Sequence, residues 1–316
     1  MTTRSADISS DDVELSVLMI CFNSEPKVGR FLPCIASALE GVELTSEIVF
    51  VDNGSTDGTA AAARASVPSA RVLTLNPNRG SSGARNAAAR AARGRWLLLC
   101  DDDVELTVES LQSLWAARDP RNCVIPLVRD LRGALQNSVT AEWHWGDLKL
   151  VNHPEPVAEA VYPVAACMLL TRSLYWEAGG FDERYQPNCY EDAAFGFALA
   201  EVGARVVMVH DATITHFVHG TDASGIALRS VSDHLVEYRE RIYKNRWLFD
   251  LLVLRGWRRW LAVGLGLPRT VIESGRVRSS APARGYVLGW RAYLRARTMT
   301  ARPAPGDVAD RQSAVA

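Results

Sequence analysis

The chain has 316 residues, of which 48% are apolar and 22% charged, a balance typical of a globular protein rather than a disordered or fibrous one. Its formal net charge of −1 argues against a general nucleic-acid-binding protein. The charge is unevenly distributed, however. Residues 241–300 carry 13 basic and 2 acidic side chains and residues 301–316 are balanced, so residues 1–240 carry a net charge of −12. The sequence therefore predicts a basic C-terminal region attached to an acidic body.

Neither the ends of the chain nor its cysteines indicate secretion. Residues 1–13 are polar and acidic and lack the apolar run of a secretory signal. No stretch of about 18 uncharged apolar residues predicts a membrane-spanning helix. The six cysteines are scattered without a C-x-x-C pair, which favours free thiols in a reducing compartment. We expect a cytoplasmic protein with disordered segments at residues 1–13 and 301–316.

Apolar runs alternate with helical patterns over the first hundred residues. Strands are predicted at residues 15–21, 47–51, 71–75 and 95–100. Helices are predicted at residues 27–40, 57–66 and 82–93. This alternation is typical of right-handed βαβ units on a parallel sheet. Further along, strands are predicted at 161–170, 204–209 and 212–217, and helices at 191–202 and from about residue 228.

Polar side chains follow each of the first four predicted strands at the point where the strand ends. Asn23 follows the first strand, Asp52 the second, residues 76–80 the third and Asp101 the fourth. In parallel α/β sheets, ligands bind in a crevice outside the carboxyl ends of the strands. The sequence therefore predicts a ligand site at this edge of the sheet.

Three adjacent carboxylates, Asp101, Asp102 and Asp103, come directly after the fourth predicted strand. A divalent cation would relieve their mutual repulsion, and carboxylate oxygens suit Mg²⁺ or Mn²⁺. On an extended segment, residues i and i+2 point the same way, so Asp101 and Asp103 are predicted to share one ion while Asp102 faces a substrate hydroxyl. The alternative is a solvated acidic turn that caps a helix near residue 107.

Residues 51–59 and 76–94 have the composition of nucleotide-binding segments. Asp52 or Asn53 can accept the ring N–H of a pyrimidine base, although capping of the next helix would explain the same residue types. In the second segment, arginines can neutralise phosphate and Asn86 can form a hydrogen bond. An ordinary Ala-rich helix with exposed arginines is the alternative there.

Carboxylates and histidines between residues 190 and 220 are the remaining candidates. Glu191 and Asp192 open a predicted helix, where a rigidly held carboxylate is a good general base, with N-capping as the alternative. His210, His216 and His219 follow a predicted strand, and one of them could complete a metal shell or contact a diphosphate. The pattern does not decide which.

Taken in order, these motifs resemble the family 2 glycosyltransferases of the GT-A fold, and in spacing the bacterial rhamnosyltransferases of that family. The resemblance is carried by the segments SVLMICFNSE, VDNGSTDGT, NRGSSGARNAA, LLLCDDDVEL, GGFDE, YED and THFVHG. It implies an α/β GT-A domain over residues 14–227, with a Rossmann-like, mostly parallel sheet flanked by helices. Residues 228–300 would form a basic helical appendage.

The resemblance also implies where the donor and its metal bind. Asp101 and Asp103 match the metal-binding Asp-x-Asp pair, with Asp102 beside them on the donor. His216 best matches a late histidine that contacts the metal or the diphosphate, with His219 as the alternative. The nucleotide sugar would be held by Cys21, Asn23, Asp52, Asn53, Arg79, Gly80, Arg85 and Asn86.

On the acceptor side, Asp192 matches the family's catalytic base, with Glu191 beside it. Family members often carry a further Asp and an Arg after the base, at positions held here by Ala194 and Ala198, so an unusual acceptor pocket is expected. Aromatic faces stack on sugar rings, which makes three consecutive residues candidates for acceptor contacts, with a core role as the alternative. These are Trp143, His144 and Trp145.

The activity implied is metal-dependent, inverting transfer of a hexose from a UDP- or dTDP-sugar, with Mg²⁺ or Mn²⁺ as the ion. The acceptor would be a hydroxyl of a glycan, a lipid-linked sugar or a small molecule. Asp192, with an ordinary aspartate pKa, would be ionised at neutral pH. One alternative, a sugar nucleotidyltransferase, would carry a Gly-rich basic loop where this chain has CFNSEPK. The other alternative is a non-catalytic nucleotide-sugar-binding protein.

The basic region at residues 241–300 has two interpretations. Its arginines, tryptophans and leucines suit an anionic membrane surface at the inner face of the plasma membrane. The same helices could instead pack on the acidic body. The sequence leaves both open, together with a homodimer.

Overall fold

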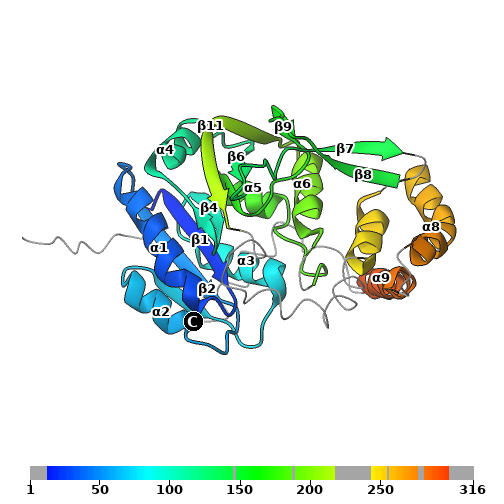
Figure 1. The fold of residues 1–316 in the computed structure, drawn as a ribbon, viewed down its shortest axis with the longest axis horizontal. Helices are drawn as coiled ribbons and strands as arrows, with labels where there is room; N and C mark the ends of the chain where they lie inside the picture. The colour runs from blue at the N-terminus through cyan, green and yellow to red at the C-terminus, as the bar shows by residue number, and fades with distance from the viewer. Residues whose placement is uncertain are drawn as a thin grey trace, which may run out of the picture.

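The structure is a computed structural model that describes residues 13–144, 147–186, 189–217, 243–254, 256–276 and 281–298 (Figure 1). The first part alternates strands and helices: β1 (Leu15–Cys21), α1 (Glu25–Glu40), β2 (Ser46–Asp52), α2 (Thr59–Ser66), β3 (Arg71–Thr74), α3 (Gly80–Ala91) and β4 (Trp96–Asp101). These confirm the predicted elements with boundary shifts of one or two residues.

The second part is more irregular than the first. Its elements are β5 (Val104–Glu105), α4 (Val108–Ala116), β6 (Cys123–Arg129), β7 (Val139–His144), β8 (Asp147–Asn152), β9 (Glu159–Ala160), β10 (Cys167–Thr171), α5 (Arg172–Glu177), α6 (Glu191–Glu201) and β11 (Val206–His216). The β7–β8 hairpin was not predicted. The two strands expected at 204–217 are one strand, whose pairing with β6 shifts register between Val209 and Thr213.

One large sheet has the strand order β3-β2-β1-β4-β10-β6-β11-β5, with β9 pairing β11. Strands β3, β2, β1 and β4 are parallel, as are β6 and β11, whereas β10 runs antiparallel to both β4 and β6. The sheet is therefore mostly parallel rather than wholly so. An apolar run has the same composition in either direction, which is why the sequence pattern did not reveal β10's orientation.

Helices cover both faces of this sheet (Figure 1). One core lies between the sheet and helices α1, α2 and α4, and includes Leu32 and Leu111. The other lies between the sheet and helices α3, α5 and α6, and includes Ala88 and Phe195. Because β1 and β4 are central and buried on both sides, their carboxyl ends are fixed firmly in space.

The C-terminal region consists of a helix at residues 243–253, α8 (Gly256–Arg276) and α9 (Ala281–Thr298). Leu248 and Phe249 pack with Tyr185 and Ala193, so the first of these helices is joined to the α6 side of the body. Helices α8 and α9 lie together at the end of the molecule toward which the β7–β8 hairpin points (Figure 1). None of the helices in the described ranges is long and apolar enough to cross a membrane.

Candidate active site

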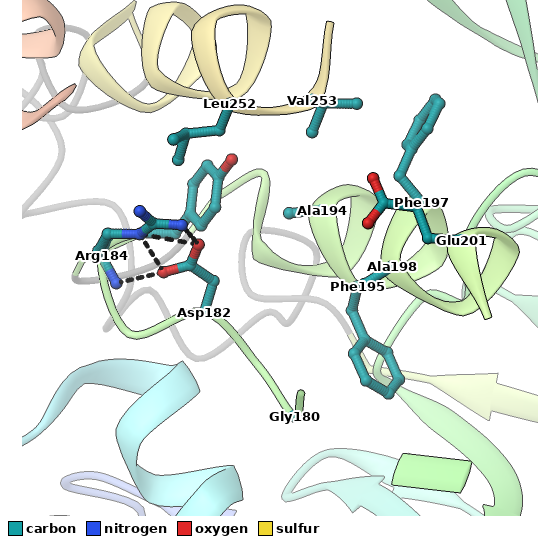
Figure 2. A pocket seen from close by; sticks show the side chains of 11 residues that line it. Gly180, Asp182, Arg184, Ala194, Phe195, Phe197, Ala198, Glu201, Leu252 and Val253 are labelled. Atoms are coloured by element: carbon teal, nitrogen blue, oxygen red, sulfur yellow. Dashed lines mark hydrogen bonds and ion pairs between the residues drawn. The ribbon is translucent and has the colours of Figure 1, made fainter. Parts of the chain in front are cut away.

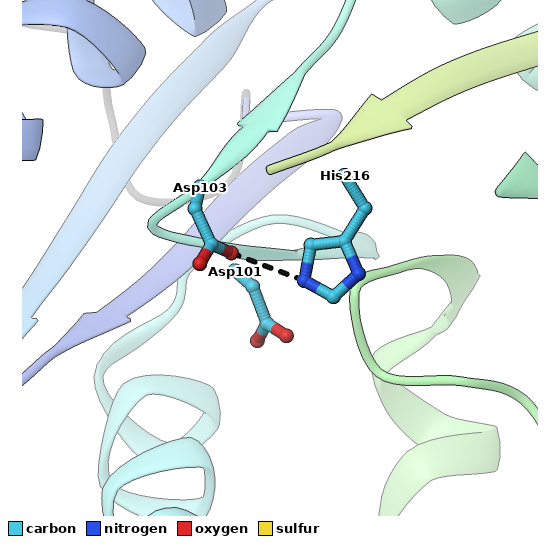
Figure 3. A group of neighbouring side chains, drawn as sticks. All are labelled: Asp101, Asp103 and His216. Atoms are coloured by element: carbon cyan, nitrogen blue, oxygen red, sulfur yellow. Dashed lines mark ion pairs between the residues drawn. The ribbon is translucent and has the colours of Figure 1, made fainter. Parts of the chain in front are cut away.

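Asp101, Asp103 and His216 meet at the carboxyl ends of β4 and β11 (Figure 3). One ligand atom from each lies within 4.8 Å of the others. The predicted convergence of Asp101 and Asp103 is confirmed, but not by strand alternation. The chain turns at Asp102 and Asp103 before entering β5, and this turn swings Asp103 back toward Asp101.

This group of side chains fits a divalent cation. Two carboxylates and one imidazole offer the oxygen and nitrogen donors that Mn²⁺ accepts, and Mg²⁺ would use chiefly the carboxylates. Strand pairing places His216 here, since its partner across the sheet is Val104, directly after the Asp triplet. His219, the alternative ligand, lies outside the described residues.

Lys27 is a cation in this cluster that sequence reasoning missed. Its Nζ lies 3.3 Å from Asp102 Oδ1 and 3.2 Å from Asp103 Oδ2. Asp102 also accepts a hydrogen bond from the Ser24 hydroxyl, so it faces the start of α1 rather than open solvent. The signal was present in the segment CFNSEPK, which places a lysine in the first turn after β1.

The cluster's own contacts set its protonation. Burial alone would raise the pKa of Asp103, but hydrogen bonds and charges from His216 and Lys27 lower it below the usual aspartate value. Burial would lower the pKa of His216, yet its hydrogen bond to Asp103 raises it. The ring is held at both nitrogens, with Nε2 3.1 Å from Asp103 Oδ1 and Nδ1 3.0 Å from Gln136 Oε1. Asp103 thus stabilises the protonated form of the His216 ring, which lies between two hydrogen-bond partners.

Arg85, buried on α3, connects the candidate metal cluster of Asp101, Asp103 and His216 with the start of α6. Its Nη2 lies 3.1 Å from Asp101 Oδ1, and its Nη1 lies 3.5 Å from Glu191 Oε1 and 3.7 Å from Asp192 Oδ1. Burial would lower the pKa of Arg85, but these three carboxylates raise it, so the guanidinium stays charged. Arg85 therefore neutralises groups from two separate predicted motifs.

Asp192, the predicted base, faces this arginine from the first turn of α6. Its Oδ2 accepts a hydrogen bond of 3.1 Å from the Ala165 amide, whereas its Oδ1 is buried and has no hydrogen-bond partner among the described residues. The expectation of an ordinary pKa is wrong: burial raises the pKa of Asp192 to about 7, although Arg85 opposes the rise. A carboxylate with this pKa can both take and release a proton near neutral pH.

Glu191 is the most buried carboxylate at the helix start. Its Oε1 accepts a hydrogen bond of 2.8 Å from the Ser81 hydroxyl in addition to its contact with Arg85. Neither acid acts as the N-cap, because the capping position is Tyr190, in a left-handed conformation with φ 69°. The capping alternative is therefore not what the structure shows.

The residues expected at the nucleotide form the neighbouring loops. Cys21 is buried at the end of β1, and burial raises the pKa of its thiol well above the ordinary value. The Asp52 Oδ1 accepts the Ser55 amide at 2.9 Å, which shapes the turn after β2. Asn23, exposed and left-handed with φ 51°, accepts the Thr56 amide at 2.9 Å and so joins the β1 and β2 loops.

Asn53 and Asn86 are held by bonds within the protein. Asn53 donates to Asn78 Oδ1 and to the Gly80 carbonyl, each at 3.1 Å, and accepts the Arg79 amide at 2.9 Å. Its side chain thus fixes the 78–80 turn, in which Gly80 has a positive φ of 70°. Contact of Asn53, Arg79 or Gly80 with a base or phosphate stays a prediction.

Asn86 is buried and binds the segment that precedes α6. It donates to the Phe181 carbonyl at 2.8 Å and to Glu183 Oε1 at 2.9 Å, and accepts from the Tyr175 hydroxyl and the Phe181 amide. These four bonds use both ends of the amide. The structure therefore gives Asn86 a positioning role beside Arg85.

On the acceptor side, Trp143 and His144 end β7, and the structure describes only their backbone, while Trp145 lies outside the described residues. A separate cavity of about 260 Å³ includes both Ala194 and Ala198 (Figure 2). It lies between the 180–185 segment, α6 and the helix at residues 243–253, and the Asp182–Arg184 ion pair borders it. The two alanines thus line an open space at the positions where, by the resemblance, family members often carry an Asp and an Arg.

Solved structures with the same fold define the class of protein. The S. aureus TarS 1-349 complex with UDP-GlcNAc aligns over 78% of this chain and 69% of its own, with a TM-score of 0.52 and 19% identity. GalNAc-T7 with UDP, GalNAc and Mn²⁺ aligns over 77% of this chain and 53% of its own, with a TM-score of 0.53 and 16% identity. These identities are low, so the likeness establishes a shared fold, that of the GT-A glycosyltransferases.

Sequence comparison gives the family. Residues 16–177 match the family described as Glycosyl transferase family 2. The chain is 27% identical over 262 residues to the N-acetylglucosaminyl-diphospho-decaprenol L-rhamnosyltransferase of Mycobacterium tuberculosis, an alignment covering 72% of this chain and 82% of that protein. It is 36% identical over 102 residues to the succinoglycan biosynthesis protein ExoO of Rhizobium meliloti, covering 32% and 28%. The chain belongs to glycosyl transferase family 2 and is a transferase similar to rhamnosyltransferases.

Proposed function

We propose that the protein is a metal-dependent, inverting glycosyltransferase that moves a sugar from a UDP- or dTDP-sugar to a hydroxyl of a lipid-linked acceptor. The observation that carries this proposal is the position of Arg85, which contacts both the candidate metal ligand Asp101 and the candidate base Asp192. The mycobacterial relative's name specifies a decaprenyl-diphosphate-linked sugar as acceptor, which supports the lipid-linked class. The alternatives, a nucleotidyltransferase and a non-catalytic binding protein, have no comparable support.

Asp101, Asp103 and His216 are the residues that would hold Mn²⁺ or Mg²⁺. When bound, the ion would neutralise the negative charge that develops on the nucleoside diphosphate as it leaves. Lys27, beside Asp102 and Asp103, is placed to add a second positive charge on the same side. Binding at this cluster requires His216 to lose the proton that Asp103 favours in the free protein.

Asp192 would take the proton of the acceptor hydroxyl on Oδ1, the oxygen without a hydrogen-bond partner among the described residues. The hydroxyl oxygen then bonds to the anomeric carbon while the bond to the diphosphate oxygen breaks. One such displacement from the opposite face inverts the anomeric centre. Arg85 keeps part of the Asp192 population ionised at neutral pH because its charge opposes the effect of burial.

Two variants test this assignment. Asp192→Asn should retain donor binding but lose about 10²–10⁴-fold in turnover, the range for a positioned base. Asp103→Ala should instead lose Mn²⁺-dependent donor binding, measured by calorimetry with UDP- and dTDP-sugars. Asp119→Asn, an exposed aspartate after α4, is the matched control and should leave both unchanged. Near wild-type turnover in Asp192→Asn would remove Asp192 from the role of base.

A further inference from the structure

The described part of the chain leaves ten large apolar side chains exposed, and eight of them lie on α8 and α9. Five are on α8: Trp260, Leu261, Leu265, Val271 and Ile272. Three are on α9: Val287, Leu288 and Leu294. We call these eight side chains the apolar face. Such a concentration of exposed apolar groups marks an interaction site rather than ordinary surface.

Helical spacing places the α8 members of the apolar face along one side of the helix. At about 100° per residue, positions 260, 261, 265, 271 and 272 fall on one side of the helix, and the two residues between them that the structure describes as exposed, Gly264 and Pro268, are uncharged. The other side of α8 packs inward, because Gly266 lies so close to Trp247 that an added Cβ would be 2.7 Å from its ring. The apolar face is thus the side of α8 that the described part of the chain leaves uncovered.

Basic side chains accompany the apolar face on α9. Arg284 and Arg291 are exposed on the same surface as Val287 and Leu288. Helix α9 contains no acidic residue, and residues 241–300 as a whole carry a net charge of +11. The surface therefore combines apolar groups with positive charge.

The two helices present their faces side by side. Trp260 of α8 and Leu294 of α9 line one groove of about 310 Å³, together with Arg259 and Trp290. Tryptophan and arginine beside leucine are typical of helices that lie in the interface plane of a membrane. A long arginine side chain can reach the headgroup phosphates while its stem contacts apolar surface.

We propose that the apolar face of α8 and α9 rests on an anionic lipid bilayer, with its apolar side chains at the boundary of headgroups and acyl chains and Arg291 at the lipid phosphates. Charge favours a bilayer over a second copy of this chain, because a symmetric contact would bring two strongly basic regions together. The inference concerns a surface apart from the metal cluster and goes beyond the proposed transfer reaction. It does not depend on Asp192 being the base.

Vesicle co-sedimentation of the full chain tests the proposal. The protein should bind vesicles of phosphatidylcholine with phosphatidylglycerol, bind pure phosphatidylcholine more weakly, and lose binding as salt is raised. The double variant Val271→Glu/Ile272→Glu should lose at least about tenfold in affinity, since it removes two apolar groups and adds negative charge. Its matched control is Leu131→Glu, the same kind of change at an exposed apolar residue elsewhere.

The charge component has its own pair of variants. Arg291→Glu should weaken binding to the anionic vesicles by about tenfold or more, whereas Arg64→Glu on α2 should not. The residues changed in these variants are all exposed, so circular dichroism and thermal melting should show that every variant folds like the wild type. They are Leu131, Val271, Ile272, Arg64 and Arg291. Absent vesicle binding, or a double variant that binds as tightly as the wild type, would overturn the proposal. A second result would also overturn it: the wild type is a dimer in sedimentation velocity and does not bind vesicles, and Val271→Glu/Ile272→Glu is a monomer. The apolar face would then join two copies of the chain.

Discussion

Replacing Arg85 by glutamine should move the pH dependence of the reaction, not only its rate. The Arg85 Nη1 lies 3.7 Å from Asp192 Oδ1. An opposite charge this close lowers a carboxyl pKa by about 1–3 units, so its loss should raise the pKa of Asp192 from about 7 to about 8–10. Because only the ionised base is active, each unit costs about tenfold in rate at neutral pH.

The assay is the pH profile of kcat/KM by coupled release of the nucleoside diphosphate. The rising limb of the Arg85→Gln profile should lie at higher pH than that of the wild type. Arg85→Lys is the control, because it keeps the positive charge but loses the contacts of two separate guanidinium nitrogens. Its rising limb should stay near the wild-type position. A glutamine variant that is slower at every pH but has an unshifted limb would refute the electrostatic role of Arg85.

Unfolding gives a second measurement that requires no activity. Without Arg85, the carboxylates of Asp101, Glu191 and Asp192 lose their shared partner, which costs about 3–5 kcal/mol when a buried pair is broken. Burial already raises the pKa values of Asp101 and Asp192, and without Arg85 they rise further, so the folded variant binds more protons than the unfolded chain and its stability falls as pH rises. In urea unfolding, the difference from wild type should be larger at pH 8 than at pH 5. Equal differences at both pH values would contradict this account.

Three further predictions concern the neighbouring side chains. Lys27→Met should raise Mn²⁺ affinity severalfold in calorimetry, because Lys27 competes with the ion for Asp103. Lys27→Arg, which keeps the positive charge, should leave the affinity unchanged. An unchanged affinity in Lys27→Met would show that Lys27 and Mn²⁺ do not compete. Mn²⁺ affinity should rise with pH up to the raised pKa of His216 and then level off, because the ring must lose its proton to bind the ion. An affinity that does not change with pH would contradict this prediction. Asn86→Ala should lower the free energy of unfolding by about 3 kcal/mol, because it leaves the Tyr175 hydroxyl and the Phe181 amide unpaired in the core. An unfolding free energy equal to that of the wild type within experimental error would refute the positioning role of Asn86.

The sequence predicted that Asp101 and Asp103 converge, but for a partly wrong reason. Strand alternation was expected to align Asp101 and Asp103, but a turn at Asp102 brings them together. Their position after a buried strand was enough to place them at the crevice, because the carboxyl ends of parallel strands share one edge. His216 could be placed only by resemblance, since its approach depends on β11 pairing with β5, a contact between segments more than 100 residues apart.

Residue type alone did not reveal which polar groups are already used within the protein. Asn53 and Asn86 were both assigned to the donor, yet each side chain is bound at both ends to neighbouring backbone or side chains. An amide that can bind a ligand can equally bind a turn, and only the three-dimensional neighbours decide. Lys27 was overlooked for the converse reason, because its partners are carboxylates 75 residues away in the chain.

The C-terminal region contributes to the start of α6, where the candidate base lies, as well as to the apolar face. Cys189 and Tyr190 both have positive φ, at 78° and 69°, a conformation that costs energy for residues other than glycine. Asn245 donates a hydrogen bond of 3.1 Å to the Cys189 carbonyl, and Phe249 packs against the Tyr190 ring. The helix at residues 243–253 therefore stabilises the strained turn that aims Glu191 and Asp192 at Arg85. Since Trp247 of this helix packs against Gly266 on the inner side of α8, a bilayer bound at the apolar face would lie across α8 from the helix that supports the candidate base Asp192.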